Sequence, residues 1–207
     1  MRGRLLIFVG FLANVGFLAN MGYGQNVLSP PPSAYQPITG EGRVAWAFED
    51  TVGISSLFVG TISAGWGTLF DKPHEYGTHW LGFGKRYGMR LTGIATENVM
   101  EAGLGALLGE DPRYFRDPGA PFRDRVHHVI KLTFLARNRD GDLLPAYARY
   151  AGIAGSSFLS NTWRPNSEAN TSQAIERIGL GFAGRMGKNA FVEFWPDVKH
   201  HVFHWGR

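Results

Sequence analysis

The chain has 207 residues, of which 44% are hydrophobic, with 28 glycines, no cysteine and a formal net charge of +4. This length suits a single domain, and the lack of cysteine excludes disulfides, a thiol nucleophile, a thiolate metal site and a lipid-bearing N-terminal cysteine. Arg2 and Arg4 provide two of the excess charges, so the rest of the chain is close to balanced, which argues against a nucleic-acid-binding protein.

Residues 1–24 have the pattern of a signal peptide for export. A charged start precedes the apolar run LLIFVGFLANVGFLA, and small residues stand at positions −3 and −1 before Gln25. We therefore predict cleavage after Gly24 and a location in the cell envelope, either the periplasm or the outer membrane. The alternative is an uncleaved membrane anchor.

Residues 25–40 are rich in proline and predict an extended arm that leads into one helical domain over residues 41–197. Residues 52–70 predict a helix without any charge, just long enough to cross a membrane. Glycine, serine and threonine dilute this stretch and form a ridge of small residues at Ser56, Gly60 and Ala64. Two interpretations stay open: a helix embedded in or lying on a membrane, and a buried helix of a soluble bundle.

Residues 71–90 predict a glycine-containing loop with incomplete motifs. His74, Glu75 and His79 resemble the zinc motif HExxH, but the second histidine comes one position too late to share a helical face. The pair Gly84-Lys85 lacks the rest of a phosphate-binding loop. We predict neither a metal nor a cofactor here.

Residues 91–109 form the central predicted helix, which is apolar or small almost all round and therefore typical of a buried helix. Glu97 and Glu101 lie one turn apart on it and repel each other if both are ionised. A buried carboxylate needs a cation, hydrogen bonds or a proton. Gly109 is a suitable residue to end the helix.

Beyond Gly109, Asp111 before Pro112 predicts the cap of a new turn, and Arg113 follows. We expect Arg113 to fold back and pair with Glu101 as a structural latch. A catalytic carboxylate pair and plain solvated charges are the alternatives. The candidate catalytic residues are Glu97, Glu101, Asp111, Arg113 and His127, with His128 as a neighbour.

Residues 117–137 fit either a short helix or a strand, and residues 138–142 predict a turn. Asn138, Asp140 and Asp142 resemble the start of a calcium loop, but Leu143 stands where that loop requires glycine. We therefore predict no calcium site in this turn.

Two more helices are predicted, at residues 144–163 and 172–195, with Pro145 in the first turn of one and Pro196 ending the other. The first carries a ridge of small residues at Ala148, Gly152 and Ser156. The second has a small face and an opposite basic face, which suits either anionic lipid headgroups or solvent. The small face consists of Gly179, Ala183, Gly187 and Ala190, and the basic face contains Arg177, Arg185 and Lys188. Residues 198–207 predict an exposed histidine-rich tail.

The runs GFGKRYG, GALLGEDPRYFR, YARYAG, SNTWRP and NAFVEFWPD resemble an uncharacterised family of exported bacterial envelope proteins, over residues 40–197. The DPRYF and EFWPD runs are the most specific parts of this resemblance. The family has no established activity, so the resemblance implies one recurring fold and no catalytic residue.

We predict an all-α fold, a bundle of about four to five helices packed through glycine, alanine and serine ridges and associated with a membrane. Tryptophans near segment ends are typical of a membrane interface. The expected function is a non-enzymatic structural or binding role, with membrane lipid or other envelope components as partners and without nucleic acid, metal or cofactor. The alternative is a membrane-bound hydrolase of a lipid or phosphoester that uses Glu97, Glu101, Asp111 and Arg113. Acids that converge in an open pocket favour the hydrolase, and acids sealed in pairs favour the structural role.

Overall fold

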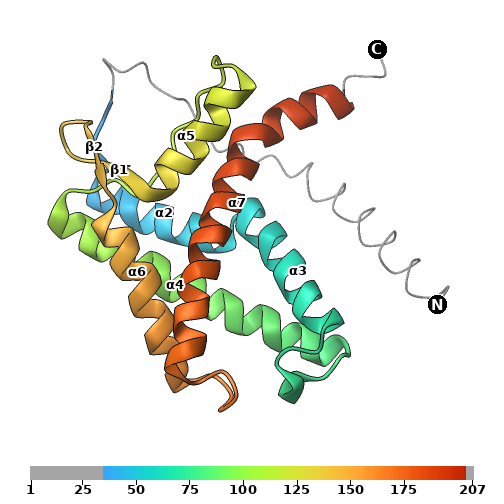
Figure 1. Cartoon of the computed structure of the whole chain (residues 1–207). Helices are drawn as coiled ribbons and strands as arrows, with labels where there is room; N and C mark the ends of the chain where they lie inside the picture. Colours follow the sequence, from blue (N-terminus) through green and yellow to red (C-terminus); the bar gives the residue numbers. More distant parts are fainter. Residues whose placement is uncertain (1–34, 204–207) are drawn as a thin grey trace.

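The computed structural model describes residues 35–203, with side chains described as far as residue 199, and confirms the predicted all-α bundle (Figure 1). The predicted signal peptide and most of the predicted arm lie outside the described residues. The elements are α2 (Gly40–Val52), α3 (Ile54–Leu69), η2 (His74–Tyr76), α4 (Trp80–Leu108), α5 (Phe122–Phe134), β1 (Leu135–Arg137), β2 (Leu143–Pro145), α6 (Tyr147–Leu159), η3 (Ser160–Thr162) and α7 (Thr171–Phe203).

Helix α4 is the element around which the others pack. Helices α2, α3 and α6 contact it, and α7 packs against α3, α5 and α6. Figure 1 shows α7 running in front of α4 and crossing it near the middle of the molecule. The prediction of a helix buried almost all round is wrong for α4. Asn98, Glu101 and Gly105 are buried on its packed side, whereas Val99 and Leu107 are exposed.

Small residues allow α6 to approach α4 closely, as the ridge on α6 predicts. A Cβ atom at Gly152 would lie 3.1 Å from the carbonyl oxygen of Glu97 and 3.3 Å from the backbone nitrogen of Glu101. Ala148 and Ser156 on the same ridge are also buried. The two helix backbones are therefore in contact at this crossing.

The ridge of small residues on α3 is buried as well. Ser56, Gly60 and Ala64 all lie on the packed side of the helix. A Cβ atom at Gly60 would lie 2.8 Å from a guanidinium nitrogen of Arg90 and 3.2 Å from the ring of Tyr87, both on α4. The small face of α3 therefore packs on α4.

The uncharged stretch predicted as one helix over residues 52–70 is divided. Helix α2 ends at Val52, Gly53 is extended (ψ 158°), and α3 begins at Ile54. Glycine suits this break because a Cβ atom there would lie only 2.3 Å from the carbonyl oxygen of Glu49. Figure 1 shows α2 and α3 running in different directions on the two sides of the break.

The predicted loop over residues 71–90 is wrong in its second half, because α4 begins at Trp80. Its glycines lower the intrinsic helix propensity, but Arg86 anchors this part of α4 to the preceding loop. The Arg86 guanidinium donates to the carbonyl oxygens of Lys72 (2.7 Å), Gly77 (2.6 Å) and Pro73 (2.8 Å). These tertiary bonds favour the helix over the local preference.

The end of α4 confirms the prediction at Gly109, which adopts the left-handed conformation (φ 77°). The next prediction is wrong in that no helical turn follows Asp111, although its Oδ1 accepts the backbone N–H of Arg113, as in an Asx turn. Residues 110–116 are extended, and the backbone N–H of Asp111 donates to the carbonyl oxygen of Arg137 (2.8 Å). The segment after α4 therefore lies against β1.

Residues 138–142 form the predicted turn, between antiparallel strands β1 and β2. Asn138 Oδ1 accepts the backbone N–H groups of Asp140 and Asp142, both at 2.9 Å, which closes the turn. Residues 117–137 contain both elements the sequence allowed, because α5 is followed directly by β1. Helix α6 begins at Tyr147, so Pro145 lies in β2 and not in a first helical turn.

Helix α7 does not end at Pro196, as predicted, but continues to Phe203. Proline removes a backbone hydrogen bond inside a helix. The carbonyl oxygen that loses its donor is that of Val192, four residues before Pro196. In the same turn, the guanidinium groups of Arg116 and Arg125 both donate to the carbonyl oxygen of Glu193. Figure 1 shows the last turns of α7 bending away from the bundle.

The polarity of α7 is the reverse of that predicted. The small face is largely exposed, including Ala183, where the prediction of close packing is wrong. Gly181 packs instead, because a Cβ atom there would lie 2.8 Å from a methyl group of Ile153. The basic face points inward, and Arg185 is buried.

The whole bundle has a polar interior and an apolar exterior. Most of the buried apolar residues are alanines, and the larger ones are Val129, Leu132 and Ile153. Large apolar side chains are exposed on every helix from α2 to α7. The buried charged residues are Arg43, Arg86, Glu101, Glu110, Asp111, Arg125, Arg149, Arg185 and Glu193.

Candidate functional site

Glu101 lies at the centre of the buried charges, and the prediction that it pairs with Arg113 is wrong. Arg149 Nε on α6 donates to Glu101 Oε1 at 2.9 Å, and Arg185 on α7 donates to Glu101 Oε2. All three side chains are almost fully buried. Arg185 is also 3.4 Å from Asp50 of α2, which contacts Lys188. This ion network joins α2, α4, α6 and α7.

Arg149 also holds the end of α5. Its NH1 group donates to the carbonyl oxygens of Leu132 (2.7 Å) and Thr133 (3.1 Å), in the last turn of that helix. Cations are favourable at helix C-termini because the last carbonyl groups have no partner within the helix. Burial lowers the pKa of Arg149 to about 10, so the guanidinium stays protonated at neutral pH.

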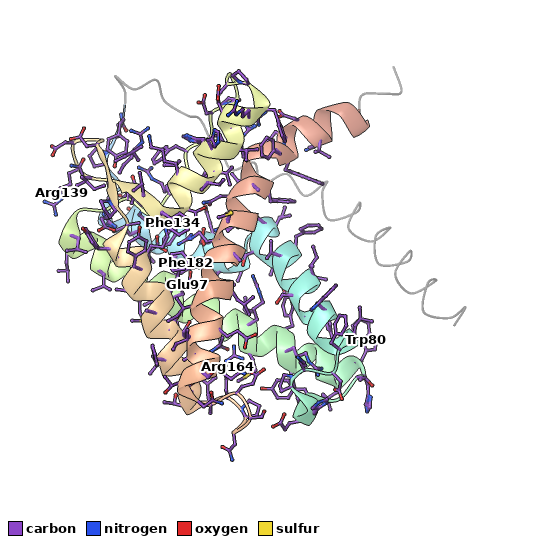
Figure 2. The ribbon with its side chains drawn as sticks, viewed as in Figure 1. Trp80, Glu97, Phe134, Arg139, Arg164 and Phe182 are labelled. Atoms are coloured by element: carbon purple, nitrogen blue, oxygen red, sulfur yellow. The ribbon has the colours of Figure 1, made fainter. Side chains whose placement is uncertain are left out.

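Glu97 lies one turn from Glu101, and Figure 2 labels it in the middle of the bundle. Burial raises its pKa above the usual value, and the charges of Arg185, Arg149 and Arg90 oppose this shift. The two glutamates therefore differ in environment, since Glu101 has arginine partners in direct contact. Glu97 is half-buried, whereas Glu101 is buried between Arg149 and Arg185.

Asp111 takes Arg113 as its partner. Asp111 Oδ1 accepts the backbone N–H of Arg113 (3.0 Å), and the guanidinium donates to Oδ2 at 2.6 Å. The Tyr35 hydroxyl also donates to Oδ2 at 3.0 Å. Burial and the neighbouring Asp111 raise the pKa of Tyr35 to about 12, so it keeps its proton at neutral pH.

Glu110 has a structural role at the start of α6. Its carboxylate oxygens accept the backbone N–H groups of Tyr147 (3.0 Å) and Ala148 (2.9 Å). A carboxylate is favourable at this position because the first N–H groups of a helix have no partner within the helix. The space that Glu101, Glu110 and Asp111 line is too small to hold a water molecule.

The histidines do not join the acids. His127 is exposed on α5. His128 Nε2 is 2.7 Å from the carbonyl oxygen of Phe115, and its ring packs edge-on against Tyr114. The five predicted catalytic residues are therefore distributed over separate sites and do not converge in one open pocket.

A second buried network, which the sequence analysis missed, centres on Glu193 of α7. This side chain is fully buried (0% exposed). Arg125 Nε donates to Glu193 Oε1 at 2.7 Å, and the Tyr114 hydroxyl donates to Oε2 at 2.9 Å. Arg125 NH1 also donates to Asp197 at 2.6 Å.

This network brings together the DPRYF and EFWPD runs. Tyr114 belongs to the first, whereas Glu193 and Asp197 belong to the second, and Arg125 binds both acids of the second run. The spacing of Glu193 and Asp197 places them one turn apart on a helix. This i, i+4 spacing could have indicated the network from the sequence. The prediction that the helix ends at Pro196, however, placed Asp197 outside the helix.

The motifs with resemblance to metal or phosphate sites serve other purposes. His74 Nδ1 is 2.9 Å from Asp71 Oδ2, and His79 precedes the first turn of α4. Gly84 and Lys85 lie within α4. Within residues 35–199, no three histidine, aspartate or glutamate side chains gather in a way that would hold a metal ion.

No family model, curated protein or solved structure matches this chain in comparisons with known proteins.

Proposed function

We propose that this chain is an exported envelope protein that associates with a membrane and has a structural or binding role. The observation that carries the proposal is its polarity, with paired charges inside and large apolar side chains outside. In water this arrangement is costly, because apolar surface favours burial. In contact with lipid it is favourable, because hydrocarbon accepts apolar side chains while buried polar groups satisfy one another.

The surface of α2 and α3 supports contact with lipid. By length and composition, residues 40–69 are apolar enough to cross a membrane, with a mean hydropathy of 1.3 over 18 residues of which 17% are buried. The break at Gly53 divides this stretch, and the 16 residues of α3 extend only about 24 Å. The hydrocarbon core of a bilayer is about 30 Å thick, so a helix that lies on the membrane or enters it partway suits these dimensions better.

Large apolar side chains are exposed at both ends of the loop that joins α3 and α4, and we call them the apolar tip: Trp66, Leu69 and Phe70 at the end of α3, and Trp80 and Leu81 at the start of α4. Trp66 and Phe70 pack together with ring centroids 4.6 Å apart. Figure 2 labels Trp80 at the edge of the molecule. Tryptophan favours the boundary between lipid headgroups and acyl chains. Arg86 fixes the loop behind the apolar tip, so these side chains are presented by a rigid support.

The acids named for the hydrolase alternative do not converge in the described part of the chain, and Asp111, which lines an open cavity, is held by Arg113 and Tyr35. Glu101 and Asp111 are each bound by arginine, and the space between them does not admit water. A hydrolytic site needs a water or substrate within hydrogen-bond reach of its acid or base. The paired carboxylates support the structural role.

Quenching of tryptophan fluorescence by vesicles of brominated phosphatidylcholine tests membrane contact. Trp66 is 65% exposed and Trp80 is 71% exposed, so we expect strong quenching of the wild-type protein. The double variant Trp66→Phe/Trp80→Phe should lose most of the quenched signal. The control Trp163→Phe, at a less exposed position, should retain it. Unquenched fluorescence in a folded protein that stays in the soluble phase would contradict membrane association.

Export is tested separately by the mass of the protein recovered from the cell envelope. We expect a chain that begins at Gln25, because small residues precede that position in the pattern of a cleavage site. A mature protein that still begins at Met1 would indicate an uncleaved anchor. Recovery from the cytoplasm alone would contradict export.

A further inference from the structure

A cavity of about 340 Å³ lies where the segment before α2, the N-terminus of α2, the C-terminus of α4 and the β1–β2 turn meet. Tyr35, Gly40, Arg43, Asp111 and Arg139 are among the residues that line it. Figure 2 labels Arg139 at the periphery of the molecule, on the side of the β-hairpin. This size lies at the small end of the range for small-molecule sites.

Arg43 is the unexplained group in this cavity. It is only 8% exposed, and its buried NH1 nitrogen has no hydrogen-bond partner within the described part of the chain. Buried arginine is almost always paired, because an unsatisfied charged group is costly. Asp111 is nearby, but it already accepts hydrogen bonds from Arg113 and Tyr35. NH1 is closed to solvent and lies against Gly105, 2.9 Å from a Cβ atom placed there, whereas other atoms of Arg43 line the cavity. The positive charge of Arg43 therefore favours an anion in the cavity, although NH1 itself does not face it.

Arg139, in the β1–β2 turn, provides a second cation in the lining of the cavity. Its stem packs over Gly109, where a Cβ atom would lie 3.1 Å from Arg139 Cγ. Its guanidinium makes one long contact, 3.5 Å from NH2 to the carbonyl oxygen of Ala106. Most of its N–H groups are therefore available to a ligand. This contact also places a cation beside the C-terminus of α4, which offsets the partial negative charge there.

The N-terminus of α2 contributes a third favourable element. Gly40 is the first residue of this 13-residue helix and lines the cavity. The Thr39 side chain satisfies the N–H of Gly42, and the positive end of the helix dipole favours an anion. Asp111, the acid in the cavity wall, is neutralised by Arg113.

We propose that this cavity binds a phosphate group. Arg43 of α2 and Arg139 of the β1–β2 turn both line the cavity. The N-terminus of α2 adds a partial positive charge to its lining. A tetrahedral phosphate presents oxygen atoms to several donors at once, and arginine pairs well with it. The source is either a phospholipid headgroup or a soluble phosphate, and the two share this chemistry.

Binding is measured in two assays with three variants. Arg139→Gln removes the exposed cation, and Gly40→Asp places a competing carboxylate at the cavity wall, where a Cβ atom meets nothing within 4 Å. Arg123→Gln is the matched control, since Arg123 is an exposed cation on α5 outside the cavity. The first assay titrates inorganic phosphate by calorimetry. The second compares flotation with vesicles of phosphatidylcholine alone and of equal parts phosphatidylcholine and phosphatidylglycerol.

We expect Arg139→Gln to weaken phosphate binding by roughly tenfold or more, from the loss of charged hydrogen bonds, and Gly40→Asp to abolish it. Arg123→Gln should bind like the wild type. If the variants differ only in flotation with phosphatidylglycerol vesicles, the ligand is a lipid headgroup. If they differ only with inorganic phosphate, it is a soluble phosphate. If neither assay separates Arg139→Gln and Gly40→Asp from Arg123→Gln, the proposal is wrong, whether or not the protein floats with neutral vesicles.

Discussion

Arg149 on α6 and Glu101 on α4 form a buried ion pair with 2.9 Å between Nε and Oε1, although 48 residues separate them in the sequence. The side chains are 3% and 2% exposed. Removing one partner of such a pair leaves the other charge buried without compensation, which typically costs about 3–5 kcal/mol. Exposed pairs contribute only about 0–1 kcal/mol.

We predict that Glu101→Ala and Arg149→Ala each lower the free energy of unfolding by about 3–5 kcal/mol, and that the double variant costs less than the sum. A double-mutant cycle by urea denaturation, in a detergent that keeps the protein soluble, measures this coupling. The same cycle on Glu101 and Arg113 is the control and should be additive, because Arg113 binds Asp111. Additive effects for Glu101 and Arg149 would refute the pair.

Gly152→Leu should destabilise the protein by about 1–3 kcal/mol through overpacking. The added side chain would meet the α4 backbone, which lies 3.1 Å from the Cβ position. Gly179→Leu is the matched control, because a Cβ atom at this exposed helical position meets nothing within 4 Å. Thermal unfolding compares the two, and an equal melting temperature for both would contradict the helix crossing.

Arg125→Ala should lower the free energy of unfolding by about 3–5 kcal/mol, because it leaves the buried Glu193 carboxylate without its cation. Arg123→Ala on the same helix removes an exposed cation and should change stability by no more than about 0.5 kcal/mol. Limited proteolysis provides a second measurement, since release of α7 from α5 should expose its last turns to cleavage. Equal stability and equal cleavage of the two variants would show that the Arg125–Glu193 contact contributes nothing.

We predict that Glu97 makes the free energy of unfolding depend on pH, because burial raises the pKa of this residue in the folded protein. As the pH rises, Glu97 loses its proton in the unfolded chain before it does so in the folded protein. Its contribution to the free energy of unfolding is therefore complete below the unfolded pKa and is lost as the pH rises through the folded pKa. Glu97→Gln should remove this loss, raising stability at neutral pH while leaving it nearly unchanged at acidic pH. Urea denaturation over a pH series measures the effect.

Glu176→Gln is the control for this series, because Glu176 is exposed on α7. It should follow the wild type at every pH, within about 0.5 kcal/mol. A Glu97→Gln variant that is less stable than the wild type at neutral pH would show that the ionised carboxylate is needed. Glu97 would then belong to the ion network of Arg90, Arg149 and Arg185.

The sequence by itself determined the helical class, the ridges on α3 and α6, the end of α4 at Gly109 and the turn at residues 138–142. These features depend on the spacing of residues within one segment and on the backbone conformations open to glycine and asparagine. They therefore need no contact with a distant part of the chain. The sequence also indicated that Glu101 needs a cation, because a buried carboxylate without one is costly.

Tertiary structure alone decided which cation Glu101 binds and which face of α7 points inward. Arg113 is near Glu101 in sequence, but the extended segment after Gly109 directs it to Asp111, while Arg149 and Arg185 arrive from distant helices. Likewise, α7 continues past Pro196, in a turn where Arg116 and Arg125 both bind the carbonyl oxygen of Glu193. Ion pairs join side chains wherever the packed helices place them, so their partners follow from the fold and not from distance along the chain.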